Sequence, residues 1–295
     1  MGAYQISVPG HNSEEVNHLR RLLQNKLQHW DPVGQTIRLE EKWVGDRTVF
    51  RLSHLRMGKQ PEKNLRLCLG TAVAEYILTV DEPELIRGII SREFHPKHRE
   101  EMDQVTEYTF HLLHENETDE GDRSFDQRKE KMVRTVVRYL SQHRNLAVDG
   151  FVRFRLKKYH RVLVKLVEHA IDEYLLDKEY QEFIDLLKYF VLVQKSKVPM
   201  VHVIHTGKRK FQVLEADGRP LRLKEMDVVV QEMMDHSYSQ EDLIVSTLLT
   251  VAPERIILHT RHDKENVIRT LMQIFEGRVV VCHGCPECRS RSHSQ

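Results

Sequence analysis

Apolar residues change their spacing along the chain, and each spacing predicts a different kind of element. Residues 4–8 alternate between apolar and polar side chains, which is typical of a short strand. Apolar side chains at helical spacing over residues 16–30 then predict a helix. Two β-rich runs at 36–44 and 47–55 flank a Gly-Asp turn and indicate a hairpin. The chain is therefore expected to begin in the order strand, helix, strand, strand.

Helical spacing continues through the middle of the chain. It predicts helices in residues 65–78, 102–113, 132–140, 151–175 and 180–191. The last two are expected to lie antiparallel to each other, with a turn near Asp177. The stretch from Asp81 to Glu84 has a capping box and an early proline, which together predict the start of another helix.

An acidic stretch, ENETDEGD at residues 115–122, interrupts these helices. Five of its eight side chains are acids and none is apolar, which is typical of a solvated loop. A metal-binding or partner-binding loop is the alternative, but the spacing of the acids does not match an EF-hand. We therefore expect a solvated loop within a helical region.

Alternating positions return after Pro199 and predict a second region of strands. Residues 200–205 and 211–216 are expected to form two strands around the turn GKRK, and the run at 226–235 is ambiguous between strand and helix. Beyond it, the pattern predicts a helix from Ser239, a strand at 255–259, a helix from Asp263 to Gly277 and a strand at 278–282. The last two strands are expected to be parallel neighbours, joined by the helix between them.

These elements predict an α+β protein in three parts. Residues 1–60 form a mixed βαββ segment, residues 61–197 form a helical domain that contains the acidic loop, and residues 198–295 form an α/β domain with a cysteine-rich tail. As an alternative, the N-terminal strands join the C-terminal sheet, so that the helical part is an insertion into a single domain.

The overall composition narrows the class of protein. The 295 residues carry a formal net charge of +1, so no global field attracts the chain to nucleic acid or to a membrane. No apolar run approaches the ~18 residues that a membrane helix needs. The N-terminal residues do not have the pattern of a secretory signal, and the cysteines do not have the pattern of a disulfide scaffold. We therefore expect a cytoplasmic protein.

The chain ends in its most specific chemical signal, the trio Cys282, Cys285 and Cys288. Thiolates at this spacing on tight turns converge on one metal ion, as in zinc knuckles. A zinc site needs a fourth ligand, for which His293, His259 or a residue of a second chain are the candidates. A thiol redox or disulfide pair, and a tail without any site, are the alternatives.

An iron–sulfur cluster is a weaker hypothesis than zinc. The bacterial ferredoxin run needs a fourth cysteine after three more residues, and Ser292 occupies that position. Other histidines form only pairs. His202 and His205, for example, are three positions apart on a predicted strand, so their side chains are expected to point to opposite faces.

A basic stretch, RFRLKKYHR, opens the long predicted helix. Its cations Arg153, Lys157 and Arg161, followed by Lys165, recur every four residues and alternate with aromatic side chains. Such a row binds the phosphates of nucleic acid, with an affinity that falls as salt rises. The alternative, which the pattern favours, is a solvated helix face whose aromatic side chains point into the core.

No pattern of an enzyme active site is present in the sequence. It contains no Walker sequence, no GxGxxG, no GxSxG and no HExxH, and no nucleophile or general base stands out. We therefore expect a protein that is not an enzyme, with a metal-dependent or thiol-dependent enzyme as the alternative.

Three stretches resemble the YtxC-like sporulation proteins of endospore-forming bacteria. They are DGFVRFRL at 149–156, SQEDLIVSTLLTVAPERIILH at 239–259, and the terminal VVVCHGCPEC. The resemblance covers nearly the whole length. It implies a cytosolic protein associated with sporulation, and the terminal cysteines look like a family feature. The family has no assigned activity, so no catalytic residue can be transferred. We therefore expect a partner-binding or regulatory protein, with an unknown protein or a second copy of the chain as the partner.

Overall fold

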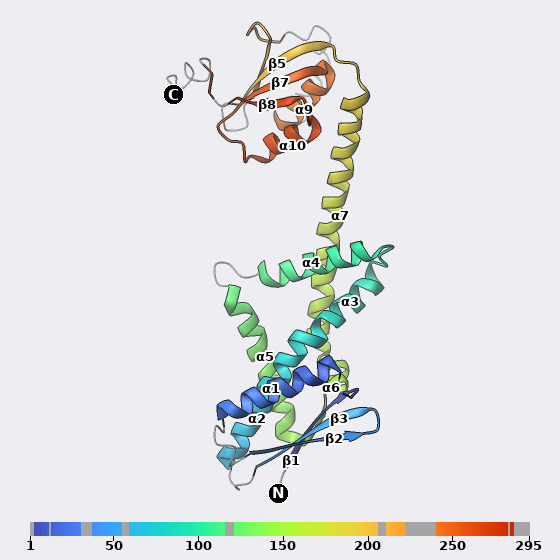
Figure 1. The fold of residues 1–295 in the computed structure, drawn as a ribbon, viewed down its shortest axis with the longest axis vertical. Coiled ribbons are helices and arrows are strands. Elements are labelled where there is room, and N and C mark those ends of the chain that lie inside the picture. The colour runs from blue at the N-terminus through green and yellow to red at the C-terminus, as the bar shows by residue number, and fades with distance from the viewer. Residues whose placement is uncertain are drawn as a thin grey trace. The chain divides into compact units, whose positions relative to one another are not determined.

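The computed structural model describes residues 3–11, 13–30, 37–54, 59–115, 121–205, 211–221, 240–282 and 284–285 (Figure 1). Helices and two four-stranded sheets confirm the α+β class. The chain divides into two compact units, residues 1–176 and 177–295, called the N-terminal and C-terminal units below. The predicted three-part division at residues 60 and 197 stays a prediction.

The sheet of the N-terminal unit contains the predicted N-terminal strands. Its strands are β1 (Ala3–Pro9), β2 (Ile37–Val44), β3 (Arg47–His54) and β4 (Asn145–Ala147), in the order β2-β3-β1-β4. β3 is antiparallel to both β1 and β2, whereas β4 is parallel to β1. The expected strand, helix, strand, strand order is confirmed. The alternative in which these strands join the C-terminal sheet is wrong, because the two sheets are separate.

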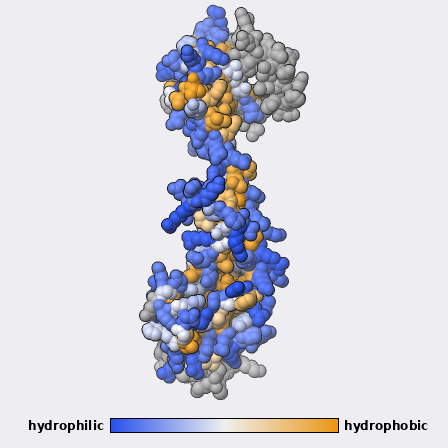
Figure 2. All heavy atoms as spheres, turned by 90° about the vertical axis from the view of Figure 1, so that its right-hand side faces the viewer, coloured by the Kyte–Doolittle hydropathy of each residue, from blue (hydrophilic) through white to orange (hydrophobic). Residues whose placement is uncertain are grey.

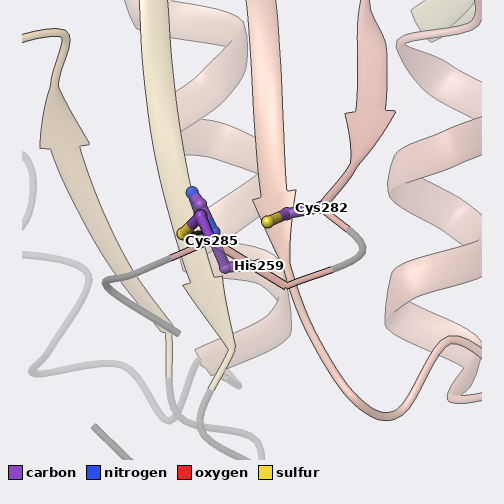
Figure 3. Close-up of side chains that lie close together, drawn as sticks. All are labelled: His259, Cys282 and Cys285. Atoms are coloured by element: carbon purple, nitrogen blue, oxygen red, sulfur yellow. Dashed lines mark hydrogen bonds between the residues drawn. The ribbon is translucent and has the colours of Figure 1, made fainter. Parts of the chain in front are cut away.

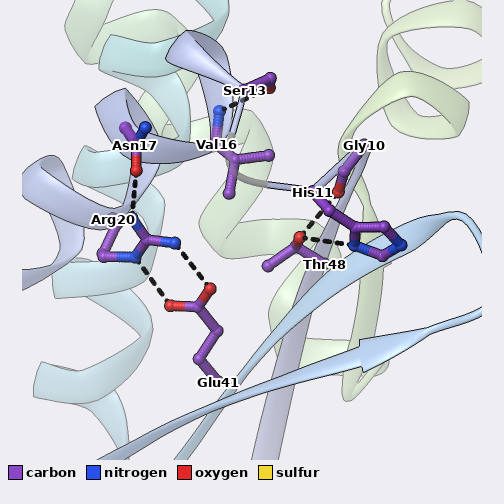
Figure 4. Close-up of polar contacts among 8 residues, drawn as sticks. All are labelled: Gly10, His11, Ser13, Val16, Asn17, Arg20, Glu41 and Thr48. Atoms are coloured by element: carbon purple, nitrogen blue, oxygen red, sulfur yellow. Dashed lines mark hydrogen bonds and ion pairs between the residues drawn. The ribbon is translucent and has the colours of Figure 1, made fainter.

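Polar contacts hold helix α1 (Glu14–Trp30) against the β2–β3 hairpin (Figure 4). Ser13 caps the helix, since its Oγ accepts a hydrogen bond of 3.3 Å from the backbone N–H of Val16. Arg20 donates two hydrogen bonds of 2.7 Å to the carboxylate of Glu41 on β2. A bidentate pair of this kind fixes orientation as well as distance. The apolar face of α1 packs into the same core as β1 and β3.

The helical part begins with a run that does not stop where the sequence predicts. α2 (Lys59–Tyr76) continues through a π-helical segment, η1 (Ile77–Asp81), into α3 (Glu82–Glu93). The predicted cap at Asp81 is wrong, because Asp81 has helical backbone angles and its side chain makes no cap hydrogen bond. The backbone N–H of Glu82 instead donates to the carbonyl of Ile77, five residues back. This wider turn carries the helix up to Pro83, whose missing N–H is tolerated in the first turn of α3.

A buried polar network ties α3 to the helices that follow. These include α4 (Arg99–Glu115), α5 (Gly121–Gln142), α6 (Val148–Arg155) and α7 (Lys157–Val193). The Glu82 side chain is almost fully buried and accepts hydrogen bonds of 2.9 and 3.1 Å from Arg128 of α5. The Tyr159 hydroxyl of α7 donates to the same carboxylate. The carboxylate is therefore paired, as a buried charge must be. Residues 116–120 of the acidic loop lie outside the described residues.

Helix α7 replaces the two antiparallel helices expected around Asp177. It is one helix of 37 residues, and the boundary between the two units falls within it. No glycine or proline occurs between Phe151 and Val198, so nothing in this stretch breaks the helix. The hairpin prediction is therefore wrong.

The C-terminal unit has the expected strand–helix–strand ending. Its strands are β5 (Val198–His205), β6 (Phe211–Glu215), β7 (Pro253–His259) and β8 (Val279–Val281), in the order β6-β5-β7-β8. β5, β7 and β8 are parallel, and β6 is antiparallel to β5. Helices α9 (Gln240–Val251) and α10 (Asn266–Ile274) share one core with the inward side chains of β5 and β7. The ambiguous run at 226–235 lies outside the described residues. Among the described helices, none combines the length and apolarity needed to span a membrane.

Candidate metal centre

The carboxyl ends of two parallel strands bring a histidine and two cysteines together. His259 is the last residue of β7, and Cys282 directly follows β8. Parallel neighbours end at the same edge of a sheet, so residues 23 positions apart in sequence become neighbours in space. The backbone N–H of Cys282 donates a hydrogen bond of 2.8 Å to the carbonyl of Leu258, which anchors the start of the tail to β7.

The three side chains have the spacing of ligands to one ion (Figure 3). One ligand atom each from His259, Cys282 and Cys285 lies within 4.8 Å of the other two. The Cys285 Sγ is 3.7 Å from the His259 Nδ1. A zinc ion holds tetrahedral sulfur and nitrogen ligands about 3.5 Å apart, given Zn–S of about 2.3 Å and Zn–N of about 2.0 Å. The separation of Cys285 and His259 therefore fits two ligands of one zinc ion.

The turn between the two cysteines depends on Gly284. This residue has a φ of 124°, and a Cβ at this position would meet no atom within 4 Å. The glycine is therefore required by its backbone conformation and not by lack of space. Its N–H lies 3.4 Å from the Cys282 Sγ and donates to it. This contact ties the middle of the turn to the first of the two cysteines.

A second histidine orients the first. The Nε2 of His259 lies 2.9 Å from the Nδ1 of His202 on β5, and the two rings are stacked with centroids 5.2 Å apart. An imidazole that binds a metal through Nδ1 keeps its proton on Nε2 and donates it to such a partner. His259 is only 6% exposed, so its ring is held by these contacts and by the surrounding chain.

His205 lies on the opposite face of β5, as the spacing of the two histidines predicts. Its Nδ1 is 3.0 Å from the Oγ1 of Thr260, and its Nε2 is 3.3 Å from a carboxylate oxygen of Glu265. Burial lowers the pKa of His205, although Glu265 acts in the other direction. His205 therefore lies beside the residues before α10 and does not belong to the Cys–His group.

The structure places only part of the predicted ligand set, and metal binding by it stays a prediction. Cys282 and Cys285 come together, and His259, one of the three candidate sources of the fourth ligand, lies beside them. Cys288 and His293 lie outside the described residues. The contribution of His202 was not apparent from the sequence, because it depends on the register between β5 and β7.

The basic row of the long helix lies in the N-terminal unit, far along the chain from the cysteines. Arg153 lies in the last turn of α6, whereas Lys157 and Arg161 lie in the first turns of α7. All three line one pocket of ≈ 750 Å³. Lys165 is one helical turn further on and is not among the described lining residues. The spacing of the row therefore brings three of its four cations to one place.

Comparison with known proteins assigns the family. The model of the YtxC-like family matches residues 67–280, which is most of the chain. The chain belongs to the YtxC-like family. The match confirms the resemblance seen in the sequence, over a shorter range than expected. Since it ends at residue 280, the cysteine trio lies beyond the matched region of this family.

A curated relative agrees with this assignment. The chain is 26% identical over 211 residues to "Uncharacterized protein YtxC" of Bacillus subtilis (strain 168), covering 70% of this chain and 73% of the relative. No solved structure matches the chain. The relationship therefore establishes the family, and an activity has to be argued from the site.

Proposed function

We propose that this protein is a cytosolic, sporulation-associated member of its family that acts through protein association, without catalysis, and that its C-terminal unit binds one zinc ion. The observation that carries the metal proposal is the convergence of His259, Cys282 and Cys285 within 4.8 Å. Two thiolates and one imidazole form a ligand set that binds zinc in preference to magnesium or calcium.

The proposed zinc is structural. Cys288 follows Cys285 by three residues and supplies the fourth ligand, in keeping with the spacing of the trio. A site closed by four protein ligands leaves no position for a water molecule or a substrate. The ion would instead cross-link the end of β7 to the segment after β8.

Metal analysis tests the proposal directly. Protein purified without chelator and without oxygen is expected to contain about one zinc per chain. Cys285→Ser and His259→Ala should each lower the zinc affinity, measured by competition with a chromophoric chelator. His202→Ala should lower it by about 10- to 100-fold, as for other groups that orient a ligand. Cys68→Ala, a thiol in the N-terminal unit, is the matched control and should have no effect.

Each result decides a specific part of the proposal. Protein that is colourless, metal-free and unable to bind added Zn²⁺ or Co²⁺ would refute the site. If Cys288→Ser binds zinc as tightly as the parent, Cys288 is not the fourth ligand. If the same holds for Cys288→Ser combined with His293→Ala in a monomeric protein, the fourth position is open, and a zinc-dependent enzyme becomes the better hypothesis. A brown protein that contains iron and sulfide would replace zinc with an iron–sulfur cluster.

Protein association is supported by an exposed apolar face of α7. Figure 2 shows apolar side chains gathered along this helix. Seven large apolar side chains of α7 in the C-terminal unit are 46–76% exposed: Tyr180, Phe183, Leu186, Tyr189, Phe190, Leu192 and Val193. Together they expose roughly 800 Å², given ~150–250 Å² for each fully exposed large side chain. This area is a sum over the helix surface, since Glu179, Glu182 and Asp185 lie between its members, and a single apolar patch on a typical monomer reaches ~300–600 Å².

We propose a second copy of the chain as the occupant of this face. One partner of a standard interface buries ~800 Å², and a twofold dimer uses the same face of both copies. Light scattering coupled to gel filtration is expected to give twice the 34.9 kDa of the chain. Leu186→Glu combined with Tyr189→Glu should give monomers, whereas Gln181→Glu, about a quarter of a turn around α7 from Tyr189, should not. A monomeric parent at high concentration would exclude the dimer and leave a different protein as the partner.

The link to sporulation rests on the family and is tested in cells. In the endospore-forming bacterium that carries this protein, loss of the gene is expected to lower the yield of heat-resistant spores. Complementation by the parent should restore the yield, and complementation by a Cys282→Ser, Cys285→Ser variant should not. An unchanged spore yield after deletion would separate this protein from sporulation.

A further inference from the structure

A pocket in the N-terminal unit combines an apolar floor with a cationic rim. Its volume is ≈ 750 Å³, and it is formed by η1, α3, α6 and the first turns of α7. The apolar part of its lining comes from Leu85, Val152, Leu156 and Tyr159. A cavity of ~300–1,000 Å³ with apolar walls and a few polar groups is the usual form of a small-molecule site.

The cations of the rim are available to an anionic ligand. Arg153, Lys157 and Arg161 are exposed, line the pocket and form no ion pair with any residue in the described parts of the chain. Arg153 lies over the Phe154 ring, 5.5 Å from its centroid, and Arg92 adds a fourth cation from α3. Since α7 begins at Lys157, the positive end of its helix dipole adds to the same field.

The acids of the pocket do not cancel this charge. Asp149 is already paired with Arg47, at 2.5 Å between Oδ1 and Nη2. Glu84 is mostly exposed and lies 3.5 Å from Arg87 in the next turn of α3. Asp81 has a buried Oδ2 with no hydrogen-bond partner among the described residues. The pocket therefore presents three unpaired cations at its rim and one buried carboxyl group in its wall.

We propose that this pocket binds a nucleotide. The phosphate lies against Arg153, Lys157 and Arg161, and the base lies over the apolar floor, where Asp81 offers a carboxyl group to its polar edge. Cations that reach one pocket from α6 and from the start of α7 suit a compact phosphate, since each supplies charge-assisted hydrogen bonds. The size of the pocket favours a mononucleotide over an extended strand. No glycine-rich phosphate loop is needed, because side chains and the start of α7 provide the positive charge.

The proposal does not depend on the metal centre. Its residues all belong to the N-terminal unit, residues 1–176, whereas His259, Cys282 and Cys285 belong to the C-terminal unit. The stretch DGFVRFRL that carries the resemblance to the family contributes Asp149, Val152, Arg153 and Leu156 to the lining. Nucleotide binding would therefore give this stretch a role beyond packing.

The test is a binding experiment with the full-length protein and a fluorescent N-methylanthraniloyl derivative of AMP. We expect saturable binding at one site per chain, competition by unlabelled AMP or GMP, and an affinity that falls as salt rises. Arg153→Ala and Lys157→Ala should each weaken binding on the order of tenfold, the loss expected for one charge-assisted hydrogen bond. Lys165→Ala is the matched control, because it removes a cation of the same helix outside the pocket, and should bind like the parent.

Four results would overturn the proposal. The first is no saturable binding of AMP or GMP up to millimolar concentration, and the second is equal competition by adenosine and AMP. The third is an equal loss of AMP affinity in Lys165→Ala and Lys157→Ala. The fourth is tight binding of a single-stranded oligonucleotide without binding of mononucleotides. The last result would identify the basic row as a nucleic-acid surface instead. Far-UV circular dichroism of each variant separates loss of the site from loss of the fold.

Discussion

The carboxyl group of Asp81 should make the stability of the N-terminal unit depend on pH in an unusual direction. Burial, and after it the negative charges of Asp149 and Glu84, raises the pKa of Asp81 to about 7. In an unfolded chain the pKa of an aspartate is about 3.9. Between these two values the folded protein holds a proton that the unfolded chain has released. The free energy of unfolding should therefore fall as the pH rises from about 4 to about 7.

The size of the effect follows from the raised pKa. Above the folded-state pKa of about 7, the ionised carboxyl of Asp81 should cost ~4 kcal/mol. Part of this cost, ~1.5 kcal/mol, is already present at about pH 5. The change Asp81→Asn keeps the shape of the side chain and removes the titration. The variant should gain stability over the parent by ~2.5 kcal/mol more at about pH 8 than at about pH 5.

Urea titration followed by tryptophan fluorescence measures this difference. Both tryptophans, Trp30 and Trp43, belong to the N-terminal unit, so the signal reports that unit alone. For a domain of this size a difference of ~2.5 kcal/mol moves the midpoint by about 1 M urea. Asp103→Asn, which changes a mostly exposed aspartate of α4, is the control and should show a much smaller dependence on pH. An equal difference between parent and Asp81→Asn at both pH values would refute the reasoning.

Three further changes test the packing and the metal. Arg128→Ala removes the partner of the buried Glu82 carboxylate and should lower the free energy of unfolding by ~3–5 kcal/mol in the same urea titration, and a loss below ~1 kcal/mol would contradict a buried ion pair. Gly70→Ala places a Cβ 2.5 Å from the Val137 Cγ2 and should lower the free energy of unfolding by ~1–3 kcal/mol. Gly88→Ala, whose Cβ would meet no atom within 4 Å, is the control. It should be neutral or stabilising in both thermal and urea unfolding. A chelator such as EDTA should lower the thermal unfolding temperature of the C-terminal unit, measured by circular dichroism. It should leave the transition reported by tryptophan fluorescence unchanged. A C-terminal unfolding temperature that EDTA does not change would contradict the structural zinc.

Local patterns predicted most elements correctly where neighbouring residues set the conformation. The hairpin at Gly45 is an example, since this residue has a φ of 62° and a Gly-Asp turn joins the two strands. The wrong predictions concern stretches whose pattern is compatible with two different structures. An apolar stripe interrupted by Asp177 suits two helices as well as one, and α7 is continuous because no residue there breaks it. Strand β4 was missed because three residues are too few to show alternation.

The candidate sites divide in the same way. The trio of cysteines and the row of cations were visible in the sequence, because their spacing along the chain is regular. Asp81 was read as a helix cap, since the residues after it have a capping pattern. Its place in a pocket wall results from the π-helical turn and from the approach of α6, which carries Asp149. Neither contact leaves a signal in the nearby sequence.

Spacing along the chain was enough to establish the α+β class, the strand–helix–strand ending and a turn that sets two cysteines side by side, because these depend on contacts between near neighbours. The pairing of His259 with those cysteines, and its support by His202, depends on three parallel strands that end at one edge of a sheet. Residues 57 positions apart meet there only after the chain has folded. Which side chains converge is therefore decided by the register between strands, a long-range property that no local pattern contains.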